Sequence, residues 1–215
     1  MNTVTEENYL KALHHLAEAT GEVNVGELSK HLNIKMPTVT SMMKKLAAKQ
    51  LVHYESYKPL KLTEKGVLKA RMVIRKHRLT EMFLEKIMGF SWEKVHEIAE
   101  QIEHIDSPLF FDKMDELLDY PKADPHGSPI PNRDGELVVE NLRRLTDCAI
   151  NETVEICAVA DTHSDFLQHL NQRNLHLGTS LTLLDIDAYD KSITLSYNKT
   201  TTTLSAVVGG RLLVK

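Results

Sequence analysis

The sequence predicts a mainly α-helical chain that ends in a small β-barrel-like domain. Apolar residues recur at helical spacing through the first half, and the last third changes to alternating strand patterns. A stretch rich in Pro, Gly and Asp at 121–135 separates the two parts, as an inter-domain linker does. Within the helical part, a helix-turn-helix followed by a hairpin predicts a winged helix. We therefore expect three domains, at 1–72, 73–135 and 136–215.

Composition excludes several classes of protein. The chain has 215 residues, of which 42% are hydrophobic and 26% charged, as in ordinary globular proteins. The first twenty residues mix charged and polar groups, unlike a signal peptide, and no apolar run reaches the roughly 18 residues of a membrane span. Cys148 and Cys157 lack CxxC spacing and suggest no disulfide framework. We expect a cytoplasmic protein that does not contact membranes.

The net charge of −4 hides an uneven distribution along the chain. Residues 1–80 hold 14 Lys/Arg against 7 Asp/Glu, a net of +7. Residues 81–135 hold 5 against 13, a net of −8, and residues 136–215 hold 7 against 10, a net of −3. A basic N-terminal third beside an acidic middle predicts a phosphate-facing module joined to a cation-binding one.

The basic third has the pattern of a winged helix. Residues 5–19 carry apolar side chains at helical spacing, and Thr5 is the expected N-cap. A second short helix is expected at 25–33, and a third has Pro37 at its first position. In a helix-turn-helix the second helix of the motif lies in the major groove of DNA. Two short strands at 51–63 complete the pattern as a wing, which lies along the DNA backbone.

The side chains expected to contact DNA come from the third helix and the wing. Short side chains at the helix N-terminus contact base edges and thymine methyl groups, while lysines reach phosphates. The expected contacts are Lys35, Pro37, Thr38, Thr40, Ser41, Lys44, Lys45 and Lys58. A small helical bundle with a hairpin is the simpler alternative. Helix lengths, the position of Pro37, charge and the hairpin together favour the winged helix.

Metal-ligand side chains recur at helical spacing in the acidic middle, where helices are expected at 66–87 and 92–104. His77 and Glu81 are four residues apart and so share one helix face. A second run at i, i+4, i+7 and i+8 consists of His96, Glu100, Glu103 and His104. Carboxylates and imidazoles converging on one face predict a divalent-ion site. A solvated helix face is the alternative, and the neighbouring DNA-binding pattern weighs against it.

Two further features of the middle and the C-terminal third bear on assembly and ligands. The helix at 107–120 begins with Ser107 and Pro108 and has more apolar residues than one small module buries, which predicts a homodimer. The linker holds Asp124 and His126, a second candidate ligand pair.

After the linker we expect strands at 153–160, 180–187 and 192–198, with one short helix at 164–174. Two final short strands are expected within 205–214.

Catalysis is not expected. His96 opens the run HEIAE, but a zinc peptidase needs HExxH, and position 100 is Glu. No nucleophile elbow, phosphate loop or dinucleotide fingerprint occurs in the sequence. A winged-helix regulator that senses an organic ligand, with the Glu/His face incidental, stays open as the non-metal alternative. A metal titration separates the two.

Four runs in this sequence carry a family resemblance: MPTVTSMMKKLAAKQLV, RKHRLTEMFL, KVHEIAEQIEH and HGSPIP. They resemble the metal-dependent repressors of the diphtheria toxin repressor and manganese transport regulator family, and the resemblance covers essentially the whole chain. It implies a C-terminal SH3-like (FeoA-like) domain and a homodimer on a palindromic operator of double-stranded DNA. It also implies two metal ions per subunit and repression of metal-ion uptake genes.

The resemblance also implies which residues bind the ions. The primary site would use Asn8, Glu100, Glu103 and His104. The ancillary site would draw on His77, Glu81, His96, Asp124, His126 and Asp165.

Departures from the family pattern bear on the choice of ion. Iron-sensing members have Cys at the Glu100 position and Met at the Asn8 position, so Mn²⁺ is expected, with Fe²⁺ as the alternative and Zn²⁺ behind both. Manganese-sensing members usually carry Asp at the Asn8 position. Short ones carry Glu where this chain has Lys11, so no second ion is expected there.

Overall fold

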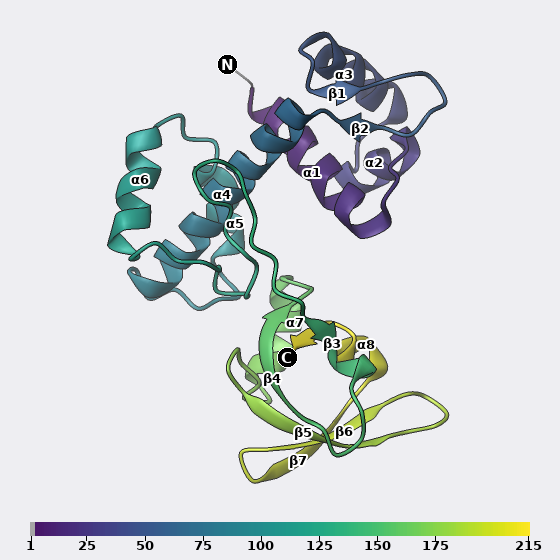
Figure 1. Ribbon diagram of the computed structural model, residues 1–215, viewed down its shortest axis with the longest axis vertical. Coiled ribbons are helices and arrows are strands. Elements are labelled where there is room, and N and C mark those ends of the chain that lie inside the picture. The colour runs from purple at the N-terminus through teal and green to yellow at the C-terminus, as the bar shows by residue number, and fades with distance from the viewer. Residues whose placement is uncertain (1–2) are drawn as a thin grey trace. The chain divides into compact units, whose positions relative to one another are not determined.

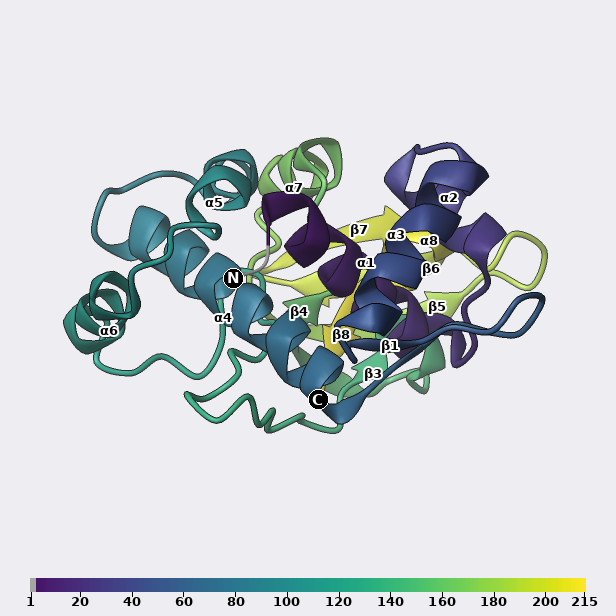
Figure 2. The same cartoon turned by 90° about the horizontal axis from the view of Figure 1, so that it is seen from above.

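The computed structural model describes residues 3–215, which divide into two compact units (Figure 1). The first takes in the chain up to His77, Glu100–Asp112 and Ile130–Leu137. The second takes in Arg78–Ala99, Lys113–Pro129 and Val138–Lys215. Helix α4 (Glu64–Lys86) is one continuous helix in Figure 2, and the division between the units falls within it. No helix in residues 3–215 is long and apolar enough to cross a membrane.

The N-terminal part of the first unit is a winged helix, as predicted (Figure 1). Its elements are α1 (Val4–Thr20), α2 (Val25–Leu32), α3 (Met36–Ala48), β1 (Val52–His53) and β2 (Lys61–Leu62). The two strands pair antiparallel, with Val52 opposite Leu62. Helix α3 buries Val39, Met43 and Leu46 completely, and α1 buries Tyr9 and Leu13 against the same core. Burial of these apolar faces holds the three helices together.

The predicted N-cap of α1 was wrong. The helix begins at Val4, and its N-cap is Thr3 rather than Thr5. Thr3 has Glu at the third position after it, so the Thr3 hydroxyl and the Glu6 carboxylate each accept a hydrogen bond from the other's backbone N–H. This reciprocal capping box satisfies two backbone donors at once. Thr5 lies inside the first turn instead.

The predicted helix at 92–104 is shorter in the structure. Helix α5 spans only His96–Ile102, because a turn closed by Lys94 N–H and Ser91 C=O precedes it. A second turn, closed by Ile105 N–H and Ile102 C=O, follows it. Helix α6 (Pro108–Leu117) begins at Pro108, as predicted. The ligand candidates at 103 and 104 therefore lie in a turn and not on a helix face.

The C-terminal domain is built around an antiparallel sheet of six strands in the order β3-β8-β4-β5-β6-β7 (Figure 1). The elements are β3 (Arg143–Arg144), η1 (Leu145–Asp147), β4 (Thr153–Val159), α7 (Ser164–Asn171), β5 (Ser180–Ile186), β6 (Ile193–Tyr197), β7 (Thr200–Leu204), α8 (Ala206–Gly209) and β8 (Leu212–Val214). Its core consists of the inward-facing apolar residues of these strands together with Leu167 and Leu170 of α7.

Two elements of this domain differ from expectation. Strand β7, a run of threonines ending in Leu204, pairs with β6 and was not predicted. The segment expected to be the first of two final strands forms the short helix α8. There the Ser205 hydroxyl accepts a hydrogen bond from Val208 N–H, and this cap favours the helical turn.

Candidate metal centres and DNA-reading surface

The primary group consists of Asn8, Glu100, Glu103 and His104, all in the first unit. Asn8 comes from α1, Glu100 from α5, and the other two from the turn that follows α5. Two neighbours of Asn8 on α1 contact the other three ligands. Glu7 lies 2.7 Å from His104, and Lys11 lies within 3 Å of both Glu100 and Glu103. Asn8 is three residues from Lys11 and so shares its helix face.

Two buried atoms of the primary group lack hydrogen-bond partners within residues 3–215. They are Oδ1 of Asn8 and Nε2 of His104. The Nδ1 atom of His104 faces the Glu7 carboxylate, which can only accept, so Nδ1 carries the proton and Nε2 keeps its lone pair. That lone pair lies 3.4 Å from Oε1 of Glu103. Buried polar atoms without partners are uncommon, and these two are available to ligate a cation.

Lys11 and His77 also meet the carboxylates of the primary group. The Lys11 ammonium donates to Oε1 of Glu100 at 2.6 Å and to both oxygens of Glu103 at 2.7 and 2.9 Å. The Nδ1 atom of His77 lies 2.6 Å from Oε2 of Glu103, whose side chain is fully buried. The structure therefore places His77 beside Glu103, although we expected it among the ancillary ligands. No sequence pattern signalled the contacts of Lys11.

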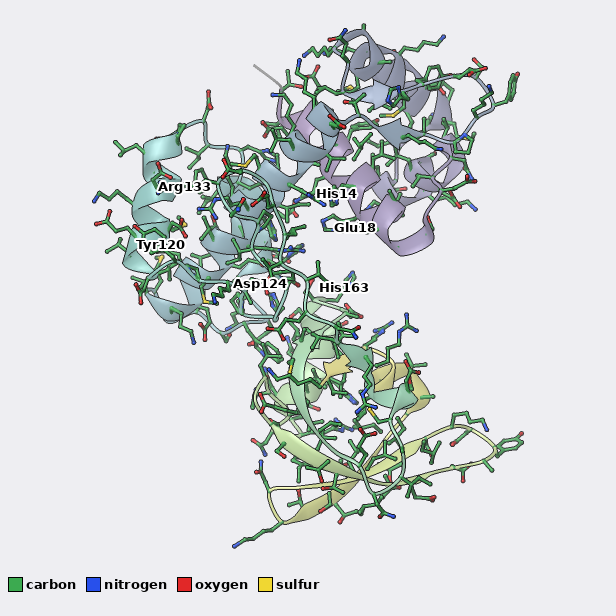
Figure 3. All side chains as sticks on the ribbon, viewed as in Figure 1. His14, Glu18, Tyr120, Asp124, Arg133 and His163 are labelled. Atoms are coloured by element: carbon green, nitrogen blue, oxygen red, sulfur yellow. The ribbon has the colours of Figure 1, made fainter. Side chains whose placement is uncertain are left out.

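The ancillary group consists of Glu81, Asp124 and His126, all in the second unit and all buried. One ligand atom from each lies within 4.8 Å of the others. Glu81 comes from α4, and the other two come from the loop after α6, where Figure 3 labels Asp124. Two carboxylates and an imidazole are ligand types that suit a divalent cation, and the Arg78 side chain, with Nε 3.6 Å from Oδ2 of Asp124, already offsets part of their charge.

Hydrogen bonds orient the ring of His126 for ligation. Its Nε2–H donates to the carbonyl of Trp92 at 2.9 Å, so in the neutral ring the lone pair lies on Nδ1. That Nδ1 has no hydrogen-bond partner in residues 3–215 and lies 3.7 Å from Oε2 of Glu81. Burial opposes the charge on this imidazole, but the Glu81 carboxylate raises the pKa of His126 above its usual value. Burial, together with the charge of Glu81, raises the pKa of Asp124.

The loop that holds the ancillary group is folded tightly against β4. The Oδ1 atom of Asp124 accepts from the backbone N–H groups of His126 and Ser128 at 2.8 and 2.9 Å. Gly127 has φ +84°, and a Cβ there would lie 2.2 Å from the carbonyl oxygen of Cys157. The loop therefore needs glycine at this position, both for its φ and for its approach to the strand.

The two remaining predicted ancillary ligands lie outside the buried group. His96 has Nδ1 at 3.2 Å from Oε1 of Glu81, with its side chain 45% exposed. It can therefore join Glu81 from the solvent side. Asp165 is exposed in the first turn of α7 and is not one of the residues whose ligand atoms cluster around Glu81.

The predicted DNA contacts lie at the start of α3, along α3 and in the loop between β1 and β2. Seven of the eight are exposed, namely Lys35, Pro37, Thr38, Ser41, Lys44, Lys45 and Lys58, while Thr40 is half-buried. Lys45 and Lys49 of α3 share a partner that the sequence did not indicate, the buried Glu6 of α1. Burial alone would raise the pKa of Glu6, but hydrogen bonds from Lys49, the Thr3 backbone and Lys45 lower it to about 2.

A winged helix, two groups of carboxylate and imidazole ligands and a small antiparallel β domain define a metal-responsive DNA-binding regulator. Three family models match the chain in order. They are the iron dependent repressor N-terminal DNA binding domain (residues 1–60), the iron dependent repressor metal binding and dimerisation domain (63–132) and the FeoA domain (143–215).

Individual relatives agree with the family models. The HTH-type transcriptional regulator MntR of Oceanobacillus iheyensis is 30% identical over 158 residues, 72% of this chain and 99% of the relative. The diphtheria toxin repressor of Corynebacterium diphtheriae is 29% identical over 205 residues, 90% and 89% of the two chains. The solved structure of a manganese-dependent transcriptional repressor in complex with manganese matches with a TM-score of 0.88 at 27% identity. The match covers 97% of this chain and 98% of that one.

The chain belongs to the diphtheria toxin repressor and manganese transport regulator family. Members of this family are metal-dependent, DNA-binding transcriptional repressors, and this chain is one of them. The predicted fold class is confirmed, including the FeoA-like domain at the C-terminal end. A family of transcriptional repressors also agrees with the expectation that the chain is not an enzyme.

Proposed function

We propose that this protein is a Mn²⁺-activated repressor of metal-ion uptake genes, with two ions per subunit. Asn8, Glu100, Glu103 and His104 hold the primary ion, and Glu81, Asp124 and His126 hold the ancillary one, with His96 as an outer ligand. The proposal rests on two buried atoms without hydrogen-bond partners in residues 3–215, Asn8 Oδ1 and His104 Nε2, the second of which lies 3.4 Å from Oε1 of Glu103.

A bound cation would supply positive charge to the carboxylates of Glu100 and Glu103. This chain's own residues carry that change to the reading helix. Asn8 would be drawn to the turn after α5, and two residues earlier on the same helix Glu6 holds Lys45 and Lys49 of α3. Fixing α1 therefore fixes the helix that we expect in the major groove. Coupling of this kind is typically about 1–3 kcal/mol, or roughly fivefold to 150-fold in affinity.

The donor sets support the choice of ion. Both groups offer carboxylate, amide and imidazole atoms, a combination that suits Mn²⁺ and Fe²⁺ better than thiolate-seeking ions. Manganese regulators stand among the relatives and among the similar solved structures. Fe²⁺ is the second candidate, because relatives named as iron-dependent repressors also match. Zn²⁺ ranks behind both.

A homodimer on palindromic DNA completes the proposal. Helix α6 leaves Leu109 71% exposed, and Leu117 and Phe110 are exposed as well. Apolar side chains of this size on one short helix are typical of a subunit interface. Two winged helices related by two-fold symmetry read two half-sites of an operator. We place this activity in the cytoplasm, with 1–72 reading DNA, 73–135 binding metal and dimerising, and 136–215 completing the FeoA-like domain.

Fluorescence anisotropy with DNA from the gene's own upstream region tests the proposal. Wild type and Glu103→Ala are titrated with Mn²⁺, anaerobic Fe²⁺, Zn²⁺ or chelator. We expect tight binding with Mn²⁺ that is lost with chelator and in the variant. Equal binding without metal, unaffected by Glu103→Ala, would contradict it and would favour a regulator that senses an organic ligand.

A further inference from the structure

Lys11 occupies the place where the primary group would hold a cation. Its Nζ lies 2.6 Å from Oε1 of Glu100 and 2.7 Å from Oε1 of Glu103, so one ammonium bridges the two carboxylates. The Lys11 side chain is 14% exposed and that of Glu103 is fully buried, so the contact is largely shielded from water. Charge-assisted hydrogen bonds in such surroundings are stronger than those at an open surface.

A divalent ion bound by both carboxylates would compete with Lys11, because the ammonium already contacts three of their four oxygens. An oxygen that accepts a short hydrogen bond from an ammonium cannot at the same time offer that lone pair to a metal ion. Electrostatics act in the same direction, because a cation of +2 would sit beside a cation of +1 at this separation. Metal binding therefore requires Lys11 to leave at least one of the two carboxylates.

We propose that Lys11 is an internal counter-cation that the activating ion must displace from Glu100 and Glu103, so that it sets the metal concentration at which the regulator responds. The inference rests on the proposed function, because it takes these carboxylates as metal ligands. It adds a residue that does not bind the ion and instead weakens its binding.

The contacts of Lys11 with Glu100 and Glu103 also hold these two carboxylates together in the metal-free protein. Without a cation, Glu100 and the buried Glu103 would repel each other, and α1 would lose a link to the turn after α5. Lys11 supplies both the charge and the link. The ion and the lysine therefore stabilise the same carboxylate pair, and competition between them raises the concentration of free metal that is needed. Removing Lys11 should raise metal affinity and lower the stability of the metal-free protein.

The test compares Lys11→Met, which keeps the length of the side chain and removes its charge, with Lys65→Met, which removes an exposed lysine in the first turn of α4. All proteins carry Glu81→Gln to weaken the ancillary group. Binding is followed as the loss of the free Mn²⁺ signal in electron paramagnetic resonance of the full chain. We expect Lys11→Met to lower the dissociation constant about tenfold, the effect of one charge-assisted hydrogen bond, and Lys65→Met to leave it unchanged.

Thermal unfolding supplies the second measurement. Without metal, Lys11→Met should unfold at a lower temperature than Lys65→Met. Added Mn²⁺ should raise the unfolding temperature of Lys11→Met by more than that of Lys65→Met. Circular dichroism checks the fold, and Lys11→Gln, which should shift affinity in the same direction, serves if the methionine variant does not fold. An unchanged or weaker Mn²⁺ affinity in the folded variants would overturn the role of Lys11.

A Glu103→Gln variant in the same background separates this inference from the proposed function. If Glu103→Gln abolishes Mn²⁺ binding while Lys11→Met has no effect, the primary group stands and the Lys11 proposal fails. If Glu103→Gln binds Mn²⁺ as tightly as its parent, the primary group itself is wrong and the Lys11 proposal fails with it.

Discussion

The carboxylate of Glu7 lies 2.7 Å from Nδ1 of His104 and determines which nitrogen of that ring is left for a metal ion. A carboxylate that orients a ligating histidine typically contributes 10- to 100-fold to metal affinity. Because Glu7 is adjacent to Asn8, one turn of α1 would supply both a proposed ligand and the support of another. We therefore expect metal affinity and the position of α1 to be coupled through residues 7 and 8.

Glu7→Ala should weaken Mn²⁺ binding about tenfold or more, because the His104 ring would no longer be held in one tautomer and orientation. Isothermal titration calorimetry measures the change. Glu18→Ala is the matched control, since it removes another glutamate–histidine contact from the same helix, the pair with His14 at 3.3 Å labelled in Figure 3. Equal effects of the two substitutions would show that Glu7 has no special role.

Lys44 lies in α3 and Lys49 directly follows its last residue, but the two should behave differently. Lys44 is exposed, and its replacement by Ala should weaken DNA binding and reduce the salt dependence of the affinity by about one counter-ion. Lys49→Ala should instead lower the unfolding temperature, because it removes the cation 2.7 Å from the buried Glu6 and leaves that carboxylate with Lys45, at 3.2 Å, and the Thr3 N–H. Anisotropy at several salt concentrations and thermal unfolding, measured on both variants, separate the two effects.

Trp92 is the single tryptophan of the chain and stacks on His126 with ring centroids 5.9 Å apart. Mn²⁺ bound at Nδ1 of His126 should therefore change the fluorescence of Trp92. We expect the change in wild type and in Glu103→Gln, and its loss in Glu81→Gln, which leaves the tryptophan and its stacking partner in place. A signal that followed Glu103 rather than Glu81 would refute the ancillary site as assigned.

Gly127→Ala should destabilise the second unit by roughly 2–4 kcal/mol, since it combines backbone strain with a close contact to β4. Gly178→Ala is the control in the same unit. Gly178 has a similar φ of +81°, and a Cβ there would meet nothing within 4 Å, so about 1 kcal/mol is expected. Chemical denaturation followed by Trp92 fluorescence measures both, and equal losses would show that the approach to Cys157 is not tight.

Much of this architecture could be predicted from local sequence patterns. Pro37 at the start of α3 and the hairpin that follows this helix each depend on residues close together in the chain. The errors have local physical causes as well. Thr5 was a plausible cap, but only Thr3 has a glutamate three residues later, and the cap at Ser205 turned an expected strand into α8.

Contacts between distant parts of the chain could not be predicted in this way. Lys11 and Glu103 are 92 residues apart, and Glu6 and Lys49 are 43 apart. No periodicity links such pairs, because they meet only after α1 has packed against other elements. The same limit applies to His77, whose spacing to Glu81 pointed to one site while its ring lies beside Glu103.

Anomalous diffraction at the manganese edge from crystals grown with Mn²⁺ tests the proposed mechanism directly. This mechanism predicts one peak bonded to Asn8 Oδ1, His104 Nε2 and the carboxylates of Glu100 and Glu103, with the Lys11 ammonium moved away from at least one carboxylate. A second peak should lie among Glu81, Asp124 and His126. Saturated crystals without a peak in the primary group, and with Lys11 still bridging the two glutamates, would contradict it.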